Sequence, residues 1–447
     1  MVRFLSIIFA IVPVLAVSYA DYDNDFVDPS YILSKDFAST TAEAQQSIVQ
    51  WADRLGSQGP WSVINKTVLP PTGNKQDYLS WAPYSWPNCS NVDNTTELTP
   101  PQMWAQCNYD YRDGQFNPDR LLVNNTGQFQ AMSDAVFYNT LAWVLTGKSN
   151  YSANAAHFLD TWFLDPTTGM TPNLQYAQMN RGPTGQVGTH TGALDLKAMA
   201  KITSAILILR GGNSPDWTIV LDTQMSNWTT HYVDWLTTSP IAYLEWTATN
   251  NHGTYFYNQL SSLYILLNDT TAAKNSTQFY FDGLYQTQIN STGDQPREAA
   301  RTHPYHYRCY NLAAMIVNAK IGKYLGLNMW NKTSAAGTTI KDALDMAMSV
   351  TLNATDGDGP IWELYPAIAA VGAAYGDPDN KYASFLANAD NQYPAQPYFL
   401  FNQNFSDSGL SATSGPTASA SGDRLSISSL GAGYYAVILL VTAALSL

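Results

Sequence analysis

The sequence predicts an all-α domain whose helices pack in antiparallel pairs and can close into an incomplete (α/α) toroid. Apolar residues recur at positions i, i+3, i+4 and i+7 in many segments, which is the period of a helix with a buried face. Several of these segments stop at Gly or Asn, as helices commonly do. No segment sustains the apolar–polar alternation that strands need. Polar motifs fall in loops and at helix starts, where the cleft of a toroid would collect them.

Helical periodicity runs through the whole middle of the chain. Some of the periodic segments are followed directly by a stop residue, such as Gly147, Asn268 or Gly326. The predicted helices are Met132–Leu145, Ala153–Phe163, Leu194–Leu209, Trp217–Thr237, Thr254–Leu267, His306–Leu325, Ile340–Leu352 and Tyr365–Tyr375.

Residues 1–20 predict a secretory signal peptide. Arg3 precedes an apolar run, and Ser18 and Ala20 place small side chains at the cleavage positions. The apolar run is too short to be a transmembrane anchor. The functional domain is therefore expected over residues 21–405.

Two segments of different composition follow this domain. Residues 406–429 are rich in Ser, Thr, Gly and Ala and predict a flexible linker. Residues 430–447 are almost purely apolar and match a GPI-attachment signal, with Ser419, Ser421 or Gly422 as the candidate attachment residue. A single C-terminal membrane helix is the alternative, although no basic residues follow it. Both interpretations hold the protein at the outer cell surface.

Composition narrows the classes of function. Aromatic and charged residues each make up 13% of the 447 residues, a balance that fits a secreted, carbohydrate-handling protein better than a disordered one. The net charge of −13 argues against nucleic acid as a partner, but a polyanionic substrate needs only a local positive cluster. Sequons typical of a glycosylated surface lie at Asn65, Asn88, Asn94, Asn124, Asn150, Asn227, Asn268, Asn275, Asn290, Asn331, Asn353 and Asn404.

The three cysteines are expected to have structural roles. In an oxidising compartment Cys89 and Cys107 predict a disulfide that closes a loop of about 18 residues and contributes on the order of 3 kcal/mol. Cys309 lies in a helical pattern and predicts a buried free thiol rather than a nucleophile. The chain contains no CxxC, HxxxH or HExxH motif, so we expect neither a metal nor a cofactor.

The densest polar motif is REAARTHPYHYRCYNLAAM, residues 297–315. It supplies cations for an anionic ligand and phenols for proton transfer. Alternatively, some of its tyrosines simply pack in the core and its histidines face solvent. The cations and phenols of interest, in a chain with only 22 Lys and Arg and 6 His, are Arg301, His303, His306, Tyr307 and Arg308.

A second motif, NNH, stands at the start of a predicted helix. Helix N-terminal N–H groups favour an anion, an Asn side chain can donate to a carboxylate, and a His can donate or accept a proton. The alternative is that an Asn merely caps the helix. Asn250 is enough for a cap, so Asn251 and His252 are predicted to bind an anion.

Reaction classes can be compared on these residues. A GxSxG nucleophile motif is absent. A glycoside hydrolase would need two carboxylates across a cleft, and its candidates also fit as partners of nearby Arg or Lys. These candidates are Asp195, Glu245, Glu298 and Glu363.

The remaining class is β-elimination from a uronic-acid polymer. The C5 proton of a uronate is weakly acidic until its carboxylate is neutralised by donors such as Asn, His and Arg. A Tyr beside cations is expected to have a lowered pKa and to act as the base. Asn251, His252, Arg301 and Tyr307 form such a set.

Four ordered motifs resemble the alginate lyase family of secreted polysaccharide lyases, which have an all-α toroid fold. They are DYLSWAPYSWPN at residues 77–88, NRGPTGQVGTHTGALDL at 180–196, NNH at 250–252 and REAARTHPYHYRCYNL at 297–312. The first is similar to the aromatic lid segment of the family. Together they span most of residues 77–375.

The resemblance implies roles for individual residues. Asn251 and His252 would bind and neutralise the substrate carboxylate with help from Arg301, and Tyr307 would be catalytic base and acid. Further substrate contacts are expected from the lid, the second motif and the flanks of the main motifs. They would come from Tyr84, Trp86, Arg181, His190, Asn250 and His306.

The substrate itself stays open at this stage. D-Mannuronate and D-glucuronate share their configuration at C4 and C5, so one Tyr can take the proton and return it to O4 in a syn elimination of either polymer. We therefore expect a monomeric enzyme acting on mannuronan or β-glucuronan. The alternatives are a glycoside hydrolase on a similar toroid and a non-catalytic glycan-binding protein of the cell wall.

Overall fold

A computed structural model describes residues 24–93, 97–352, 359–390 and 392–402. The predicted signal peptide, linker and hydrophobic tail lie outside these residues and remain predictions. None of the described helices is long and apolar enough to cross a membrane. The α-helices are α1 (Pro29–Ser34), α2 (Ala42–Gly56), α3 (Pro100–Gln106), α4 (Asn125–Thr146), α5 (Ser149–Leu159), α6 (Met199–Gly211), α7 (Ile219–Thr238), α8 (Pro240–Trp246), α9 (Asn251–Leu266), α10 (Thr270–Asp282), α11 (Pro296–Ala299), α12 (Pro304–Tyr324), α13 (Ile340–Met348), α14 (Tyr365–Tyr375), α15 (Lys381–Ala389) and α16 (Pro397–Phe401).

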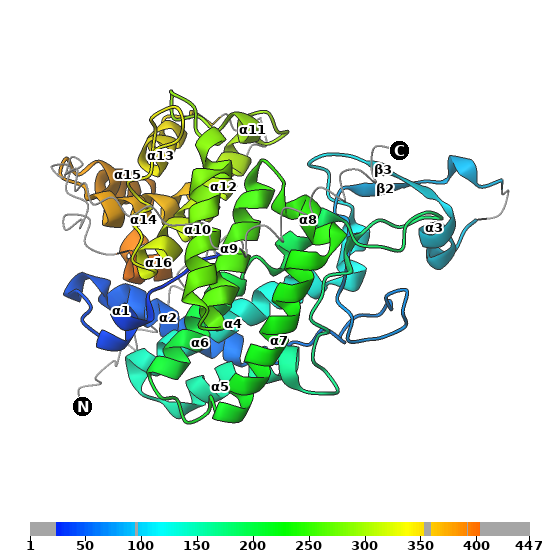
Figure 1. The fold of residues 1–447 in the computed structure, drawn as a ribbon, viewed down its shortest axis with the longest axis horizontal. Coiled ribbons are helices and arrows are strands. Elements are labelled where there is room, and N and C mark those ends of the chain that lie inside the picture. The colour runs from blue at the N-terminus through cyan, green and yellow to red at the C-terminus, as the bar shows by residue number, and fades with distance from the viewer. Residues whose placement is uncertain (1–23, 94–96, 353–358, 391, 403–447) are drawn as a thin grey trace, which may run out of the picture. The chain divides into compact units, whose positions relative to one another are not determined.

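The helices form the expected toroid (Figure 1). Helix α2 packs on α4, α4 on α6, α6 on α9, α9 on α12, and α12 on α14. Short α16 contacts both α14 and α2, so among the described helices it completes the circuit. Neighbours in sequence such as α5, α10 and α15 pack against α4, α9 and α14 respectively, as in a ring of helical hairpins.

Each predicted helical segment coincides with a helix, although several ends differ; α4, for example, begins at Asn125, seven residues before the predicted start. Residues 190–196 form a 3₁₀-helix, so α6 begins only at Met199, and α13 ends at Met348. Helix α9 was expected to be amphipathic, but nearly all of its side chains are buried. Its polar residues are satisfied by α12 instead of water: Thr254 donates to Asn311 Oδ1 (2.7 Å), and Asn258 donates to the carbonyl of Ala314 (3.0 Å).

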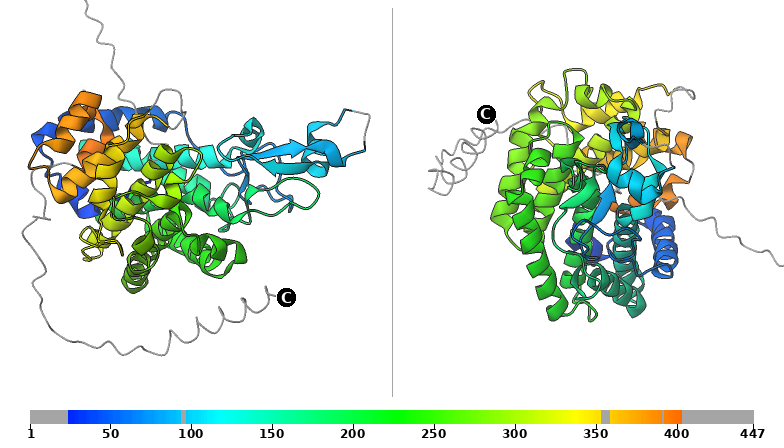
Figure 2. Two further views of the ribbon diagram at one scale, coloured as in Figure 1. Left: turned by 90° about the horizontal axis from the view of Figure 1, so that it is seen from above. Right: turned by 90° about the vertical axis from the view of Figure 1, so that its right-hand side faces the viewer.

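The expectation of no strands was too simple, because four strands of three or four residues are present. Strands β1 (Leu79–Trp81) and β4 (Tyr176–Met179) pair in parallel, and β2 (Ser85–Asn88) and β3 (Asn108–Tyr111) pair antiparallel. Segments this short cannot show a sustained alternation. Strands β2 and β3 with α3 project from the helices as a hairpin (Figure 2).

The predicted disulfide is present and pins this hairpin. Cys89 directly follows β2 and Cys107 directly precedes β3, and their sulfurs are bonded. The disulfide therefore joins the two strands at the far end of the hairpin. It stabilises the hairpin mainly by lowering the conformational entropy of the unfolded chain. Cys309 is free and buried in α12, as predicted.

The sequon asparagines can be placed where the structure describes them. Asn88 and Asn290 are half-buried, and the others in the described ranges are exposed. Their exposure is compatible with glycosylation, which itself stays a prediction. The sequons at Asn94, Asn353 and Asn404 lie outside the described residues.

A buried ion pair links two inner helices of the ring. Lys201 on α6 donates to Asp134 on α4, and their side chains are 3% and 10% exposed. We expect Lys201→Met to lower the free energy of unfolding by about 3–5 kcal/mol, because it leaves Asp134 charged and buried. Urea titration followed by circular dichroism measures this loss. The double variant Lys201→Met/Asp134→Leu should recover most of it, and equal losses in both variants would contradict this explanation.

Candidate active site

Tyr307 lies in the first turn of α12, and its side chain is buried. Pro304 starts the helix, where the missing N–H of proline is no loss. The phenol oxygen accepts a hydrogen bond from Arg301 Nη2 (2.9 Å) and lies 3.3 Å from the hydroxyl of Tyr84. The guanidinium carbon of Arg301 also sits 3.9 Å from the centre of the Tyr307 ring. Arg301 therefore touches both the ring and the oxygen of Tyr307.

The hairpin holds Arg301 in this position. Asp113, in the turn that follows β3, accepts hydrogen bonds from Arg301 Nη2 (3.0 Å) and from Thr302 (3.0 Å). Partial burial works against the charge of Asp113, but hydrogen bonds from Arg301 and Tyr111 hold its pKa below the usual value. The carboxylate thus stays ionised and fixes the guanidinium that faces Tyr307.

The expectation of a lowered tyrosine pKa was wrong for the free protein. Burial raises the pKa of Tyr307, and the neighbouring hydroxyl of Tyr84 raises it further, while Arg301 lowers it only in part. Tyr307 is 6% exposed, and desolvation of the phenolate outweighs one adjacent cation. Tyr307 is therefore protonated at neutral pH in the free protein.

The residues of the NNH motif have different roles, and Asn250 caps the helix as the sequence predicted. This residue caps α9, because its Oδ1 accepts from the backbone N–H of His252 (3.3 Å). Asn251 is buried and donates from its backbone N–H (2.7 Å) and from Nδ2 (2.6 Å) to Glu298 on α11. One amide N–H of Asn251 remains for another acceptor.

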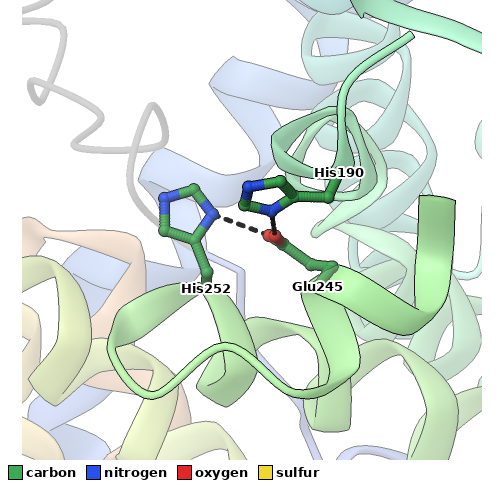
Figure 3. A group of neighbouring side chains, drawn as sticks. All are labelled: His190, Glu245 and His252. Atoms are coloured by element: carbon green, nitrogen blue, oxygen red, sulfur yellow. Dashed lines mark hydrogen bonds and ion pairs between the residues drawn. The ribbon is translucent and has the colours of Figure 1, made fainter. Parts of the chain in front are cut away.

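His252 and His190 meet at one carboxylate (Figure 3). Glu245 on α8 accepts from Nδ1 of His190 through Oε2 (2.6 Å) and from Nδ1 of His252 through Oε1 (2.7 Å). Burial alone would raise the pKa of Glu245, but the two histidines hold it below the usual value, and the hydrogen bond to Glu245 raises the pKa of His190. The 3₁₀-helix, α8 and α9 thus converge on one charged trio.

This trio is also the place where a metal could be considered. The ligand atoms of His190, Glu245 and His252 all lie within 4.8 Å of one another. Two ligands of a tetrahedral zinc stay about 3.3 Å apart, given metal–ligand bonds of about 2.0–2.1 Å. The observed contacts of 2.6 and 2.7 Å are shorter and are hydrogen-bond distances. As it stands, the trio is a hydrogen-bonded cluster.

The histidine trio and the Arg301–Tyr307 pair adjoin each other through Glu298. Its carboxylate is bound by Asn251 and also feels the charges of His252 and Arg301, although burial dominates and raises its pKa. Tyr310, one turn after Tyr307, is stacked against His306 (ring centres 5.9 Å apart). The sequence-predicted residues Asn251, His252, Arg301 and Tyr307 are therefore brought into one region at the starts of α9 and α12.

The residues predicted to contact substrate fare differently. The hydroxyl of Tyr84 contacts that of Tyr307. The ring of His306 lies beside the ring of Tyr307, with centres 5.0 Å apart, and Nδ1 of His306 contacts Glu363 (2.9 Å). Trp86 lies on β2, where its Nε1 donates to the carbonyl of Gln115 (2.8 Å).

Arg181 is not brought into this region. Its side chain is 2% exposed, pairs with Asp119 (3.1 Å) and lies between the rings of Trp81 and Tyr109. Burial lowers its pKa. The arginine stabilises the base of the hairpin, and it also lines a cavity between the hairpin and residues 180–189.

Four carboxylates have partners that the sequence did not assign. Glu245 and Glu298 were candidate hydrolase acids or partners of Lys or Arg, but they bind histidines and Asn251 instead. Asp113 was not singled out at all. Its contact with Arg301 spans 188 residues of sequence, so only the fold reveals it. The four acceptor contacts of buried Asp195 likewise come from hydroxyl and amide groups, those of Tyr78, Ser80, Thr126 and Gln178.

Comparison with known proteins decides the family. The alginate lyase family model matches residues 62–356, which is 295 of the 447 residues. The chain belongs to the alginate lyase family. It is therefore a polysaccharide lyase, and the family implies an acidic polysaccharide as substrate.

The lyase also resembles solved structures. It is similar to a crystal structure of an alginate lyase from Bacteroides ovatus, with 27% identity and a TM-score of 0.71, over 84% of this chain and 97% of that one. A more distant likeness is alginate lyase A1-III from Sphingomonas species A1, with 12% identity and a TM-score of 0.42, over 83% and 98% of the two chains. No curated protein matches the sequence.

Proposed function

We propose that the lyase cleaves mannuronan (alginate) or β-glucuronan by syn β-elimination. Tyr307 removes the C5 proton and returns it to the leaving O4, while Asn251, His252 and Arg301 bind the C5 carboxylate and stabilise the charge that builds up in the transition state. The observation that carries this proposal is the double contact of Arg301 with Tyr307, next to the NNH motif.

The raised pKa of Tyr307 suits this reaction. A phenolate with a high pKa is a strong base, which a weakly acidic C5–H requires. Arg301 is placed to stabilise the phenolate once it forms, because it contacts both the oxygen and the ring. Tyr307 then returns the proton to O4, and a phenol is an adequate acid for that step.

A path for the polymer adjoins the reacting groups. A cavity of about 490 Å³ lies between the hairpin and residues 180–189. Its lining includes Tyr111, whose ring packs against Tyr84, and Thr189, which directly precedes His190. The cavity therefore adjoins a ring neighbour of Tyr84 at one point of its lining and the residue before His190 at another.

The geometry does not favour the glycoside hydrolase alternative. An acid and a base or nucleophile should face each other across a cleft with room for a sugar or water. Here Glu245 is fully buried between two histidines, Glu298 is buried against Asn251, and Glu363 contacts His306. Each carboxylate orients another polar group.

We also propose that the protein is secreted and anchored at the outer cell surface, on the basis of the segments at its two termini.

The activity can be tested on a panel of polymers. Incubation with mannuronan, guluronan and β-glucuronan should raise the ultraviolet absorbance of the unsaturated product for mannuronan, β-glucuronan or both, because elimination leaves a C4=C5 bond conjugated with the carboxylate. New reducing ends without that absorbance would indicate hydrolysis. Binding without any product would indicate a glycan-binding protein.

A further inference from the structure

We propose that His190 and His252, bridged by Glu245, act as a single unit that binds the uronate carboxylate through the Nε2–H groups of both rings. Glu245 is then a positioning residue, and His190 contributes to binding on equal terms with His252. This inference rests on the function proposed above and adds His190 as a binding residue and Glu245 as a positioning residue to those assigned there.

The hydrogen-bond directions follow from the chemistry of the trio. An ionised carboxylate can only accept, and Glu245 contacts Nδ1 of both histidines. Each ring must therefore carry a proton on Nδ1. The second nitrogen of each ring is then on the side facing away from Glu245, as Figure 3 shows. Both Nε2 atoms are left for a ligand.

The burial and exposure of the trio's side chains suit it to binding an anion. Glu245 is fully buried, and among the described residues its ion pairs are with the two histidines alone. With both rings protonated the unit carries a net positive charge. The side chains of His190 and His252 are 40% and 16% exposed, so an anion can approach both. Their ring centres lie 6.0 Å apart, and the two oxygens of one carboxylate could accept one hydrogen bond from each.

Ligand binding should be coupled to protonation. A carboxylate at the Nε2 side favours the imidazolium form of both rings, just as Glu245 does for His190 on the Nδ1 side. The other titratable groups that face the trio are Glu298, whose charge acts on His252, and Tyr310, which lies near Glu245. Both are present unchanged in the variants compared below, so differences among these variants report on the trio.

The free protein tests the bridge without any substrate. The chain has only 6 His, so the imidazole ¹⁵N spectrum of histidine-labelled protein is simple. We expect His190 and His252 both to carry the proton on Nδ1. In Glu245→Gln the side-chain NH₂ faces one ring, which should switch to Nε2–H, and the pKa of His190 should fall. Unchanged tautomers and pKa in this variant would overturn the bridge, as would a bound divalent cation in native mass spectrometry.

Binding tests the ligand half of the proposal. Calorimetry with a mannuronate or glucuronate oligomer, on the inactive Tyr307→Phe background and in buffers of different ionisation enthalpy, should show proton uptake at alkaline pH. Adding His190→Ala, a half-exposed position that should fold normally, is expected to weaken binding at least tenfold and to reduce the uptake, while His252 keeps its Nδ1 proton. The exposed Glu43→Gln on α2 is the matched control for Glu245→Gln.

The outcomes separate the two proposals. Oligomer binding that is unaffected by His190→Ala, or that takes up no proton, would overturn this inference and leave the lyase assignment intact. A bridged pair with no affinity for any uronate oligomer would overturn the proposed substrate class together with the inference.

Discussion

Tyr307→Phe should abolish turnover while leaving substrate binding intact. The variant keeps the ring that packs against Arg301 and removes only the oxygen that takes and returns the proton. General acid–base catalysis contributes about 10²–10⁴-fold, and one residue here supplies both steps, so we expect kcat to fall by about 10³-fold or more. Initial rates of ultraviolet absorbance measure kcat, and calorimetry with an oligomer measures binding.

Tyr305→Phe is the matched control for this substitution. Tyr305 lies two residues earlier on the same helix, is 1% exposed, and donates its hydroxyl hydrogen to the backbone carbonyl of Ile361 (3.1 Å). Losing that bond should lower stability by about 0.5–1.5 kcal/mol without affecting kcat more than severalfold. Comparable losses of kcat in the two variants would contradict the assignment of Tyr307.

Arg301→Ala should give the second largest loss, about 10²–10³-fold in kcat/KM. The substitution removes a donor to the developing charge and the cation that stabilises the Tyr307 phenolate. Because Arg301 lowers the pKa of Tyr307, its removal raises that pKa further, and the alkaline rise of the rate should move to higher pH. The pH profile of kcat/KM measures both effects.

Arg301→Lys separates charge from geometry. Lysine keeps a cation near Tyr307 but lacks the planar guanidinium that lies over the Tyr307 ring while its Nη2 contacts both Asp113 and the phenol oxygen. Its rate should fall between those of the parent and Arg301→Ala, with a smaller shift of the alkaline limb. A pH profile unchanged in both variants would show that Arg301 does not act on Tyr307.

Much of the fold was predictable because helix periodicity is a local property. Every predicted segment is helical, yet the environment of α9 was misjudged. Its Thr and Asn side chains resemble a solvent-facing stripe in sequence, but they bond to α12, which lies more than fifty residues downstream. The short strands could not be seen either, because three or four residues are too few to establish a period.

The candidate site, like the fold, was predictable from the sequence only in part. Asn251, His252, Arg301 and Tyr307 stood out because polar groups crowd locally in a chain poor in charge. The contacts that hold the site in place could not be predicted, because Glu245 lies 55 residues from His190 and Asp113 lies 188 residues from Arg301. The direction of the Tyr307 pKa shift also needed the structure, since sequence shows a neighbouring cation but not the burial that outweighs it.

The mass of the products tests elimination against hydrolysis most directly. Elimination breaks the O4 bond without adding water, so the new non-reducing-end fragment should be lighter by one water than its hydrolytic counterpart. Mass spectrometry of mannuronan or β-glucuronan digests should therefore show unsaturated oligomers, and Tyr307→Phe should yield none. Fragments that all carry the added water would contradict the central claim that Tyr307, with Arg301 and the NNH motif, catalyses β-elimination.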